Sequence, residues 1–209
     1  MNDEQFDLLG FSEQKQFFHP TPPPGRKLAK YFELFLALRP QRGDAARLST
    51  DIRSLRQRFG SGAEREVLPH LWHITLSAIA QFDESFPQAK LDAIQAACGG
   101  IACPVIPVVH DRLIGFAPSG ACALLCTQET VQAIRHLRAT LAAALKSVGI
   151  SGKASSPPHL TIFYNKQQPA IAETALAAPI TWPAVAFSLV VSHYGLGHHE
   201  IVRSWDLQK

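Results

Sequence analysis

Two short motifs in the sequence place a histidine two residues before a threonine. They are His73-Ile-Thr75 and His159-Leu-Thr161, each followed by another aliphatic residue. In a strand, side chains at positions i and i+2 leave the same face about 7 Å apart along the chain, so each histidine would lie beside its threonine. Imidazole, with an ordinary pKa of about 6.5, can give or accept a proton near neutrality, and a threonine hydroxyl can donate a hydrogen bond to a phosphoryl oxygen. Each motif is therefore suited to acid–base chemistry at a phosphate.

The repetition of the motif is more informative than either copy. A single His-x-Thr between apolar residues is a weak signal and favours a structural role. Here both copies keep apolar residues at the second and fourth positions, namely Ile74, Leu76, Leu160 and Ile162. These would point into the core and hold the polar pair rigidly. We therefore expect His73 and His159 to work together, one from each half of the chain.

The hydrophobic pattern predicts the elements that position the two motifs. Apolar residues recur at helical spacing in some segments, and short apolar runs bounded by glycine and proline occur in others. We predict helices over 44–59, 87–98 and 129–148, and strands over 31–38, 71–79, 105–116, 121–126, 159–164, 184–192 and 200–205. Both halves run from strand to helix to a proline-marked loop and then to a His-x-Thr strand. This order predicts an α+β fold with two similar lobes, largely antiparallel sheets flanked by helices, and a central cleft.

Composition and the amino-terminal segment set the domain organisation. The 209 residues are 46% hydrophobic and 18% charged, which is enough apolar material for a core. Residues 1–30 include the run Pro22-Pro23-Pro24-Gly25 and are predicted to form a flexible or loosely docked arm before a two-lobed domain over 31–209. No apolar run is long enough to span a membrane, and the chain opens on acidic and polar residues. We expect a cytoplasmic monomer with no membrane contact.

Cysteines and arginines could support other kinds of site. The spacing of the four cysteines matches no common metal-ligand pattern, so we expect reduced core residues, no metal and no cofactor. The arginines crowd into one region, where they would form the wet face of a helix or contact RNA. The cysteines are Cys98, Cys103, Cys122 and Cys126, and the arginines are Arg42, Arg47, Arg53, Arg56, Arg58 and Arg65.

The remaining histidines give a weaker signal. Most of them, including His110, are expected at the surface. His193, Tyr194 and His199, near the last predicted hairpin, could rim a pocket, because loops beside a rigid site often supply binding groups.

The extended motifs resemble those of a known superfamily. Pro69-His-Leu-Trp-His73-Ile-Thr75-Leu76 and Pro157-Pro-His159-Leu-Thr161-Ile162 are similar to the motifs of the two-histidine phosphoesterases, specifically the LigT-like bacterial RNA 2',3'-cyclic phosphodiesterases known as 2'-5' RNA ligases. The resemblance runs from about Tyr31 to the carboxyl terminus. It implies a bilobal α+β fold whose two histidines meet in a cleft without a metal.

The resemblance also implies a reaction and residue roles. The reaction would be hydrolysis of a cyclic phosphodiester, such as RNA 2',3'-cyclic phosphate to a 2'-phosphate, with RNA ends or small cyclic nucleotides as partners. His159 would be the base and His73 the acid, while Thr75 and Thr161 would bind the non-bridging oxygens. The second motif continues with Phe163-Tyr164 instead of a basic residue. Tyr164 is therefore expected to bind substrate by stacking on a base or by a hydrogen bond, or else to be a half-buried strand residue.

Three other functions remain open. The same histidines could run the reaction backwards as 2'-5' RNA ligation when a 5'-hydroxyl replaces water. A non-catalytic RNA-binding module would use the arginine-rich helix and bind in a salt-sensitive way. A histidine-ligated metal hydrolase would lose activity on chelation.

Overall fold

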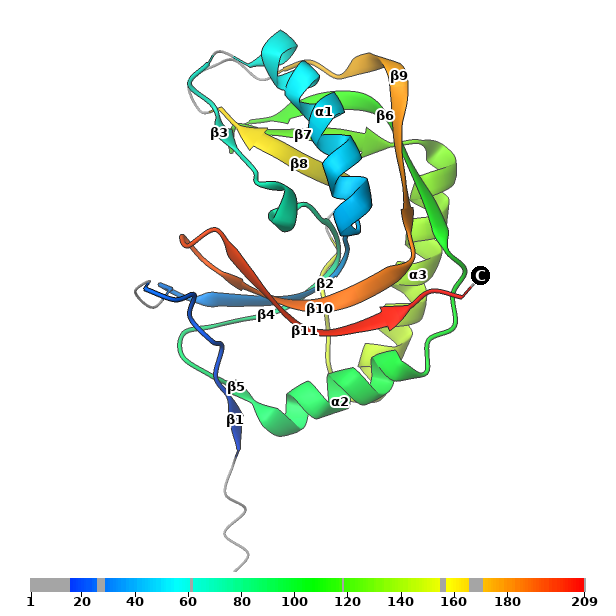
Figure 1. The fold of residues 1–209 in the computed structure, drawn as a ribbon. Coiled ribbons are helices and arrows are strands. Elements are labelled where there is room, and N and C mark those ends of the chain that lie inside the picture. Colours follow the sequence, from blue (N-terminus) through cyan, green and yellow to red (C-terminus); the bar gives the residue numbers. More distant parts are fainter. Residues whose placement is uncertain are drawn as a thin grey trace, which may run out of the picture.

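The computed structural model describes residues 16–25, 29–60, 62–117, 119–154, 157–165 and 171–208. These residues form an α+β fold with two large antiparallel sheets, each of which contains one His-x-Thr strand, and a small two-stranded sheet (Figure 1). The predicted α+β class with two lobes is confirmed.

One sheet, called the β4 sheet here, has four strands in the order β11-β10-β2-β4. Every neighbouring pair in it is antiparallel. Its strands are β2 (Phe32–Leu38), β4 (Ile74–Phe82), β10 (Ala186–His193) and β11 (His198–Asp206).

The other sheet, called the β8 sheet, has five strands in the order β3-β8-β7-β6-β9. Its strands are β3 (Arg65–Glu66), β6 (Ile106–Phe116), β7 (Ala121–Cys126), β8 (His159–Tyr164) and β9 (Thr174–Ala184). The remaining elements are the short strands β1 (Phe17–Phe18) and β5 (Phe86–Pro87), the helices α1 (Arg42–Phe59), α2 (Gln88–Gly99) and α3 (Gln128–Ser147), and the 3-10 turn η1 (Pro69–Leu71).

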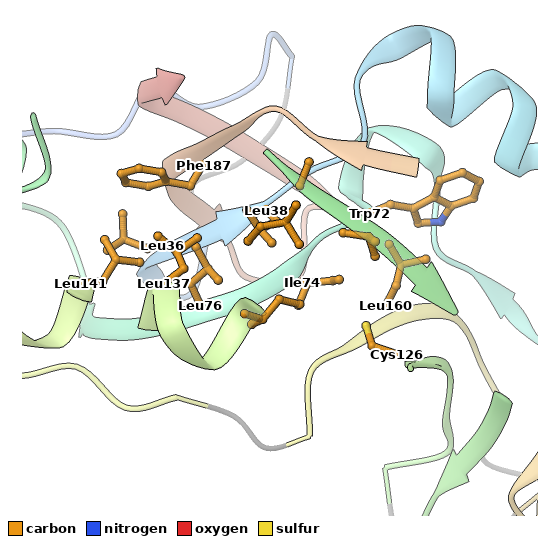
Figure 2. Packing of buried hydrophobic residues seen from close by; sticks show 14 of the residues in the cluster. Leu36, Leu38, Trp72, Ile74, Leu76, Cys126, Leu137, Leu141, Leu160 and Phe187 are labelled. Carbon is orange, nitrogen blue, oxygen red and sulfur yellow. The ribbon is translucent and has the colours of Figure 1, made fainter. Parts of the chain in front are cut away.

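The two halves of the chain are interlocked through their helices. Helix α1 follows β2 of the β4 sheet, yet it contacts β9 of the β8 sheet, and Arg47 Nη2 donates to the Thr181 carbonyl at 3.0 Å. Helix α3 follows β7 of the β8 sheet but also contacts β4. Its residues Leu137 and Leu141 lie beside Leu36 of β2 (Figure 2). Apolar residues from both sheets therefore form one hydrophobic core, so neither half buries its apolar surface alone.

Strand β9 was not predicted, although the other long elements were. It contains Pro179 and Pro183, which lack the backbone N–H that a central strand needs. The strand lies at the edge of the β8 sheet and, among the described residues, pairs only with β6, so the missing donors do not break a ladder on both sides. The predicted strand over 71–79 also begins later, at Ile74, because Pro69–Leu71 form a 3-10 turn.

The described part of the amino-terminal segment contacts the body of the protein. Strand β1 pairs with β5, and the Gln88 amide donates to the Gln16 carbonyl at 2.9 Å. The Thr21 amide donates to Glu200 Oε2 at 2.9 Å. Residues 1–15 lie outside the described residues, so the boundary between an arm and the domain at residue 30 stays a prediction.

The four cysteines are buried and free, as small core residues would be. Burial raises the pKa of Cys122 and of Cys126 to about 12, which leaves these thiols protonated and unreactive. Within the described ranges, the helices are all too short or too polar to cross a bilayer.

Candidate active site

Strands β4 and β8, which hold the two threonines, contact each other where the sheets meet. Their apolar side chains point into the shared core, where Ile74, Leu160 and Trp72 belong to one buried cluster (Figure 2). Trp72 is itself buried, and its Nε1 donates to the Val67 carbonyl at 2.8 Å. The segment that leads into the first motif is therefore held in place by packing and by a buried hydrogen bond.

His73 lies immediately before β4 and is oriented by the main chain. Its Nδ1 is 2.7 Å from the Leu71 carbonyl oxygen. Because a carbonyl can only accept, Nδ1 bears the hydrogen and Nε2 of the neutral ring is an unprotonated acceptor. The ring packs at 5.1 Å between centroids against Phe35 of β2.

His159, the first residue of β8, is built in the same way. Its Nδ1 is 2.8 Å from the carbonyl oxygen of Pro157, again two residues earlier in the chain. Its ring lies 5.1 Å from that of Phe116 on β6. The two motifs therefore present equivalent imidazoles, each with a fixed tautomer and an Nε2 atom without a protein partner among the described residues.

Charged groups from both halves of the chain act on His73. The pKa of His73 is lowered to about 4, mainly by burial and further by repulsion from Arg39 and from His159, against the opposing effect of the hydrogen bond to Leu71. Such repulsion requires the charges of the two motifs to be close. Without a bound anion His73 is therefore neutral at physiological pH.

Thr75 and Thr161 accompany the histidines as expected. Both are partly exposed, while the residues that flank them in the strands, Ile74 and Leu160 among them, are buried. Arg138 of α3 donates from Nη2 to the Thr75 carbonyl at 2.6 Å, which fixes β4 to the helix. The predicted alternation of polar and apolar side chains is present in both motifs.

A β-bulge directly follows each threonine. In β4, Thr75 pairs with Ala37 and Ser77 with Leu36, so that Leu76 is the extra residue. In β8 the extra residue is Ile162. A bulge adds one residue to one strand only and so shifts the facing of every later side chain.

The bulge in β8 decides where Tyr164 lies. Simple alternation would place it on the face opposite to His159, but it pairs with Ala121, which in turn pairs with Phe116. Paired residues share a face, and the Phe116 ring contacts His159. Tyr164 therefore lies on the face of His159, and the Arg65 guanidinium stands 4.8 Å from its ring centroid.

Other polar groups near His73 were found only in part from the sequence. The His199 ring lies 5.1 Å from that of His73, and burial lowers the pKa of His199 to about 3. Arg39, which donates to the His70 carbonyl, was missed because nothing in its spacing marks it. His193 and Tyr194, which were predicted to rim a pocket together with His199, make other contacts, with Glu200 and with Tyr31.

Two histidines lie deeper than expected. His193 is buried, with Nε2 3.3 Å from Glu200 Oε2. His110 was expected at the surface but is buried, because it occupies an inward-facing position of β6. There it accepts from Trp182 Nε1 at 3.2 Å. Tyr194 is half exposed and stacks on Tyr31 at 4.2 Å between ring centroids.

Two His-x-Thr strands from interlocked halves, in a bilobal α+β fold, define a two-histidine phosphoesterase. The family model of the 2'-5' RNA ligase superfamily matches residues 43–195. The chain belongs to the 2'-5' RNA ligase superfamily.

Solved structures share the fold at low sequence identity. Escherichia coli LigT complexed with 3'-AMP has a TM-score of 0.67 and 18% identity, covering 87% of this chain and 100% of LigT. LigT complexed with NADP+ has a TM-score of 0.66 and 18% identity, covering 88% and 100%. The protein TT0787 of Thermus thermophilus has a TM-score of 0.57 and 21% identity, covering 84% and 97%. No curated protein is similar enough in sequence to match this chain.

Proposed function

We propose that this protein hydrolyses a cyclic phosphodiester, RNA 2',3'-cyclic phosphate to the 2'-phosphate, with His73 and His159 and without a metal. The observation that supports the proposal is the matched pair of imidazoles. Each has Nδ1 against a carbonyl two residues earlier, at 2.7 Å and 2.8 Å, and each leaves Nε2 for the substrate. Two such rings from opposite halves can act on the two sides of one phosphorus.

The reaction divides proton transfer between the two rings. His159 Nε2 takes a proton from water as the water oxygen bonds to phosphorus, and His73 gives its proton to the 3' oxygen as the P–O3' bond breaks. The products are a 2'-phosphate and a 3'-hydroxyl, and the two histidines have exchanged protonation states. Thr75 and Thr161 donate hydrogen bonds to the non-bridging oxygens as negative charge builds on them.

This division requires His73 to be protonated in the complex. Burial holds its pKa at about 4 when no ligand is bound. An anionic phosphate within hydrogen-bond reach favours the imidazolium and raises this pKa. The positive charge of Arg39, which repels a proton on His73 in the free protein, attracts the same phosphate.

A nucleotide ligand is supported by what related proteins bind. LigT has been solved with 3'-AMP and with NADP+, and we propose that RNA ends or small cyclic nucleotides bind here. The Tyr164 ring, on the face of His159, would stack on a base. We further propose that the protein works in the cytoplasm as a monomer.

One assay separates this function from its rivals. Purified protein is incubated with a 2',3'-cyclic nucleotide in excess EDTA, beside the variants His73→Ala and His159→Ala. Turnover by the parent alone supports the proposal. Loss of turnover on chelation indicates a metal hydrolase, and RNA binding without turnover in any sample indicates a binding module. Adding an RNA with a 5'-hydroxyl end to the same reaction tests for the 2'-5' junction that ligation would form.

A further inference from the structure

The two His-x-Thr strands are each extended at the outer edge by a loop from the other half of the chain. The loop between α1 and β4 supplies β3, in which Arg65 pairs with Tyr164 of β8. The loop between α3 and β8 supplies Lys153, which forms a bridge with Ala78 of β4. In that bridge each amide donates to the other residue's carbonyl at 2.7 Å.

These two pairings are equivalent in position. Ala78 is the fifth residue after His73, and Tyr164 is the fifth after His159. Both lie just beyond the bulge that follows the threonine. Each half of the fold therefore places one cation, Arg65 or Lys153, beside the same position of a catalytic strand.

The strand register also sets the face on which each cation lies. Lys153 pairs with Ala78, and Ala78 pairs with Phe35, whose ring contacts His73. Because residues paired across antiparallel strands share a face, Lys153 lies on the face of His73.

The same reasoning applies to the β8 sheet. Arg65 shares the row of Tyr164, Ala121 and Phe116, and the Phe116 ring contacts His159. Both cations therefore lie on the faces that hold the catalytic histidines.

The charges of these two residues are available to a ligand. Arg65 is exposed, and its acidic neighbour Glu66 is paired with Arg56 at 2.5 Å. Lys153 is also exposed and follows Gly152 in the chain. Neither cation has a carboxylate partner in the part of the chain that the structure describes. An exposed cation without an acidic partner is a suitable contact for a phosphate.

The backbone of each cation lies several residue steps along the strand from its histidine, while the aromatic ring in the same row, Phe116 or Phe35, reaches back to that histidine. Four residue steps along β8, allowing for the bulge, separate the Tyr164 row from His159 by about 13 Å. The Arg65 guanidinium is held over the Tyr164 ring. The same number of residue steps separates the Lys153 row from His73 along β4.

We propose that Arg65 and Lys153 bind backbone phosphates of an RNA strand on opposite sides of the reacting phosphate, so that the site accepts a chain that continues in both directions. The inference rests on the proposed function in so far as the site binds a phosphodiester. It adds a substrate class to that function, because oligoribonucleotides are bound more tightly than mononucleotides. Arg65 contacts the RNA strand on one side of the reacting phosphate and Lys153 contacts it on the other side.

Equilibrium binding of three probes tests the proposal. The first is a mononucleotide 3'-phosphate, the second is an oligoribonucleotide ending in a 3'-phosphate, and the third is an oligoribonucleotide with a 2'-5' junction at its centre. The variants Arg65→Gln and Lys153→Gln are compared with Arg53→Gln and Lys146→Gln, whose side chains are exposed on α1 and α3. Binding at equilibrium does not depend on turnover, so the test stands even if the hydrolysis assay fails.

The expected results differ from probe to probe. Neither Arg65→Gln nor Lys153→Gln changes binding of the mononucleotide. One of them weakens the end-phosphorylated probe, and both weaken the junction probe, by about threefold to tenfold each. For the junction probe, the slope of log K against log salt falls by about 0.7 for each lost contact.

Three results would overturn the proposal. The first is unchanged binding of the junction probe by either variant, and the second is an equal loss on the mononucleotide. The third is a comparable loss caused by Arg53→Gln, which would assign RNA binding to the arginine-rich helix instead.

Discussion

Protonation of His73 on phosphate binding is the step on which the proposed division of roles between the two histidines depends. The pKa of His73 is about 4 in the free protein because the ring is buried and because Arg39 and His159 repel its charge. An acid that serves near neutrality needs a pKa of about 6.5 or more in the complex. The bound anion must therefore raise this pKa by about two to three units.

The size of that change follows from linkage. One pKa unit corresponds to about 1.4 kcal/mol, so a rise of two to three units couples phosphate binding to the proton by about 3 to 4 kcal/mol. Because the complex has the higher pKa, it takes up a proton as it forms. Affinity is then strongest at or below about pH 4, falls by up to tenfold per pH unit towards the pKa of the complex, and levels off above it.

Two measurements test this prediction. Isothermal titration of adenosine 2'-phosphate across pH 4.5 to 8 is compared between the parent and His73→Gln, since the variant keeps the ligand's own titration but lacks the imidazole. We expect the parent to lose about two powers of ten more affinity across this range than the variant. NMR titration of His73 with and without ligand reports the two pKa values directly. A His73 pKa that stays near 4 in the complex would refute the reasoning and make His73 the base.

Three further outcomes are expected. The substitution Thr161→Val removes a donor to the non-bridging oxygens, so kcat should fall by about 10- to 1000-fold while the thermal unfolding temperature stays unchanged. An unaltered kcat would contradict the role of Thr161 as a donor to these oxygens. Burial lowers the pKa of His110 to about 4. The contribution of neutral His110 to the free energy of unfolding should therefore be fully present above about pH 6.5 and fall by about 3 kcal/mol as pH drops towards 4. Denaturant melts of His110→Gln should show a shallower fall of this free energy with pH. Leu160 is fully buried between the sheets, so Leu160→Ala should lower the free energy of unfolding by about 2 to 5 kcal/mol in urea titrations, and a loss below about 1 kcal/mol would show that the interlocked core tolerates a cavity there.

The local pattern of the sequence accounts for much of the fold. The predicted strands over 121–126 and 159–164 have the observed bounds, and the three helices begin and end within two residues of those predicted. These elements could be predicted because the signals that mark them span only a few residues: apolar periodicity, a proline before a strand, and a glycine after a helix.

The candidate site could be predicted from the sequence for the same reason, but only as a set of residue types. The spacing of His73 and Thr75 predicts that they share a face, and the same holds for His159 and Thr161. What holds the rings is also local, since each Nδ1 lies against a carbonyl two residues earlier. The motif itself therefore contains both the reactive group and the group that orients it.

Only the tertiary structure decided which other groups reach this site. The bulge at Ile162 turns Tyr164 onto the face of His159, the crossing loops bring Arg65 and Lys153 beside the two His-x-Thr strands, and β11 brings His199 to His73. These placements depend on pairing between segments far apart in the chain. A one-residue change of register reverses every side chain that follows, and no spacing within a single segment reports it.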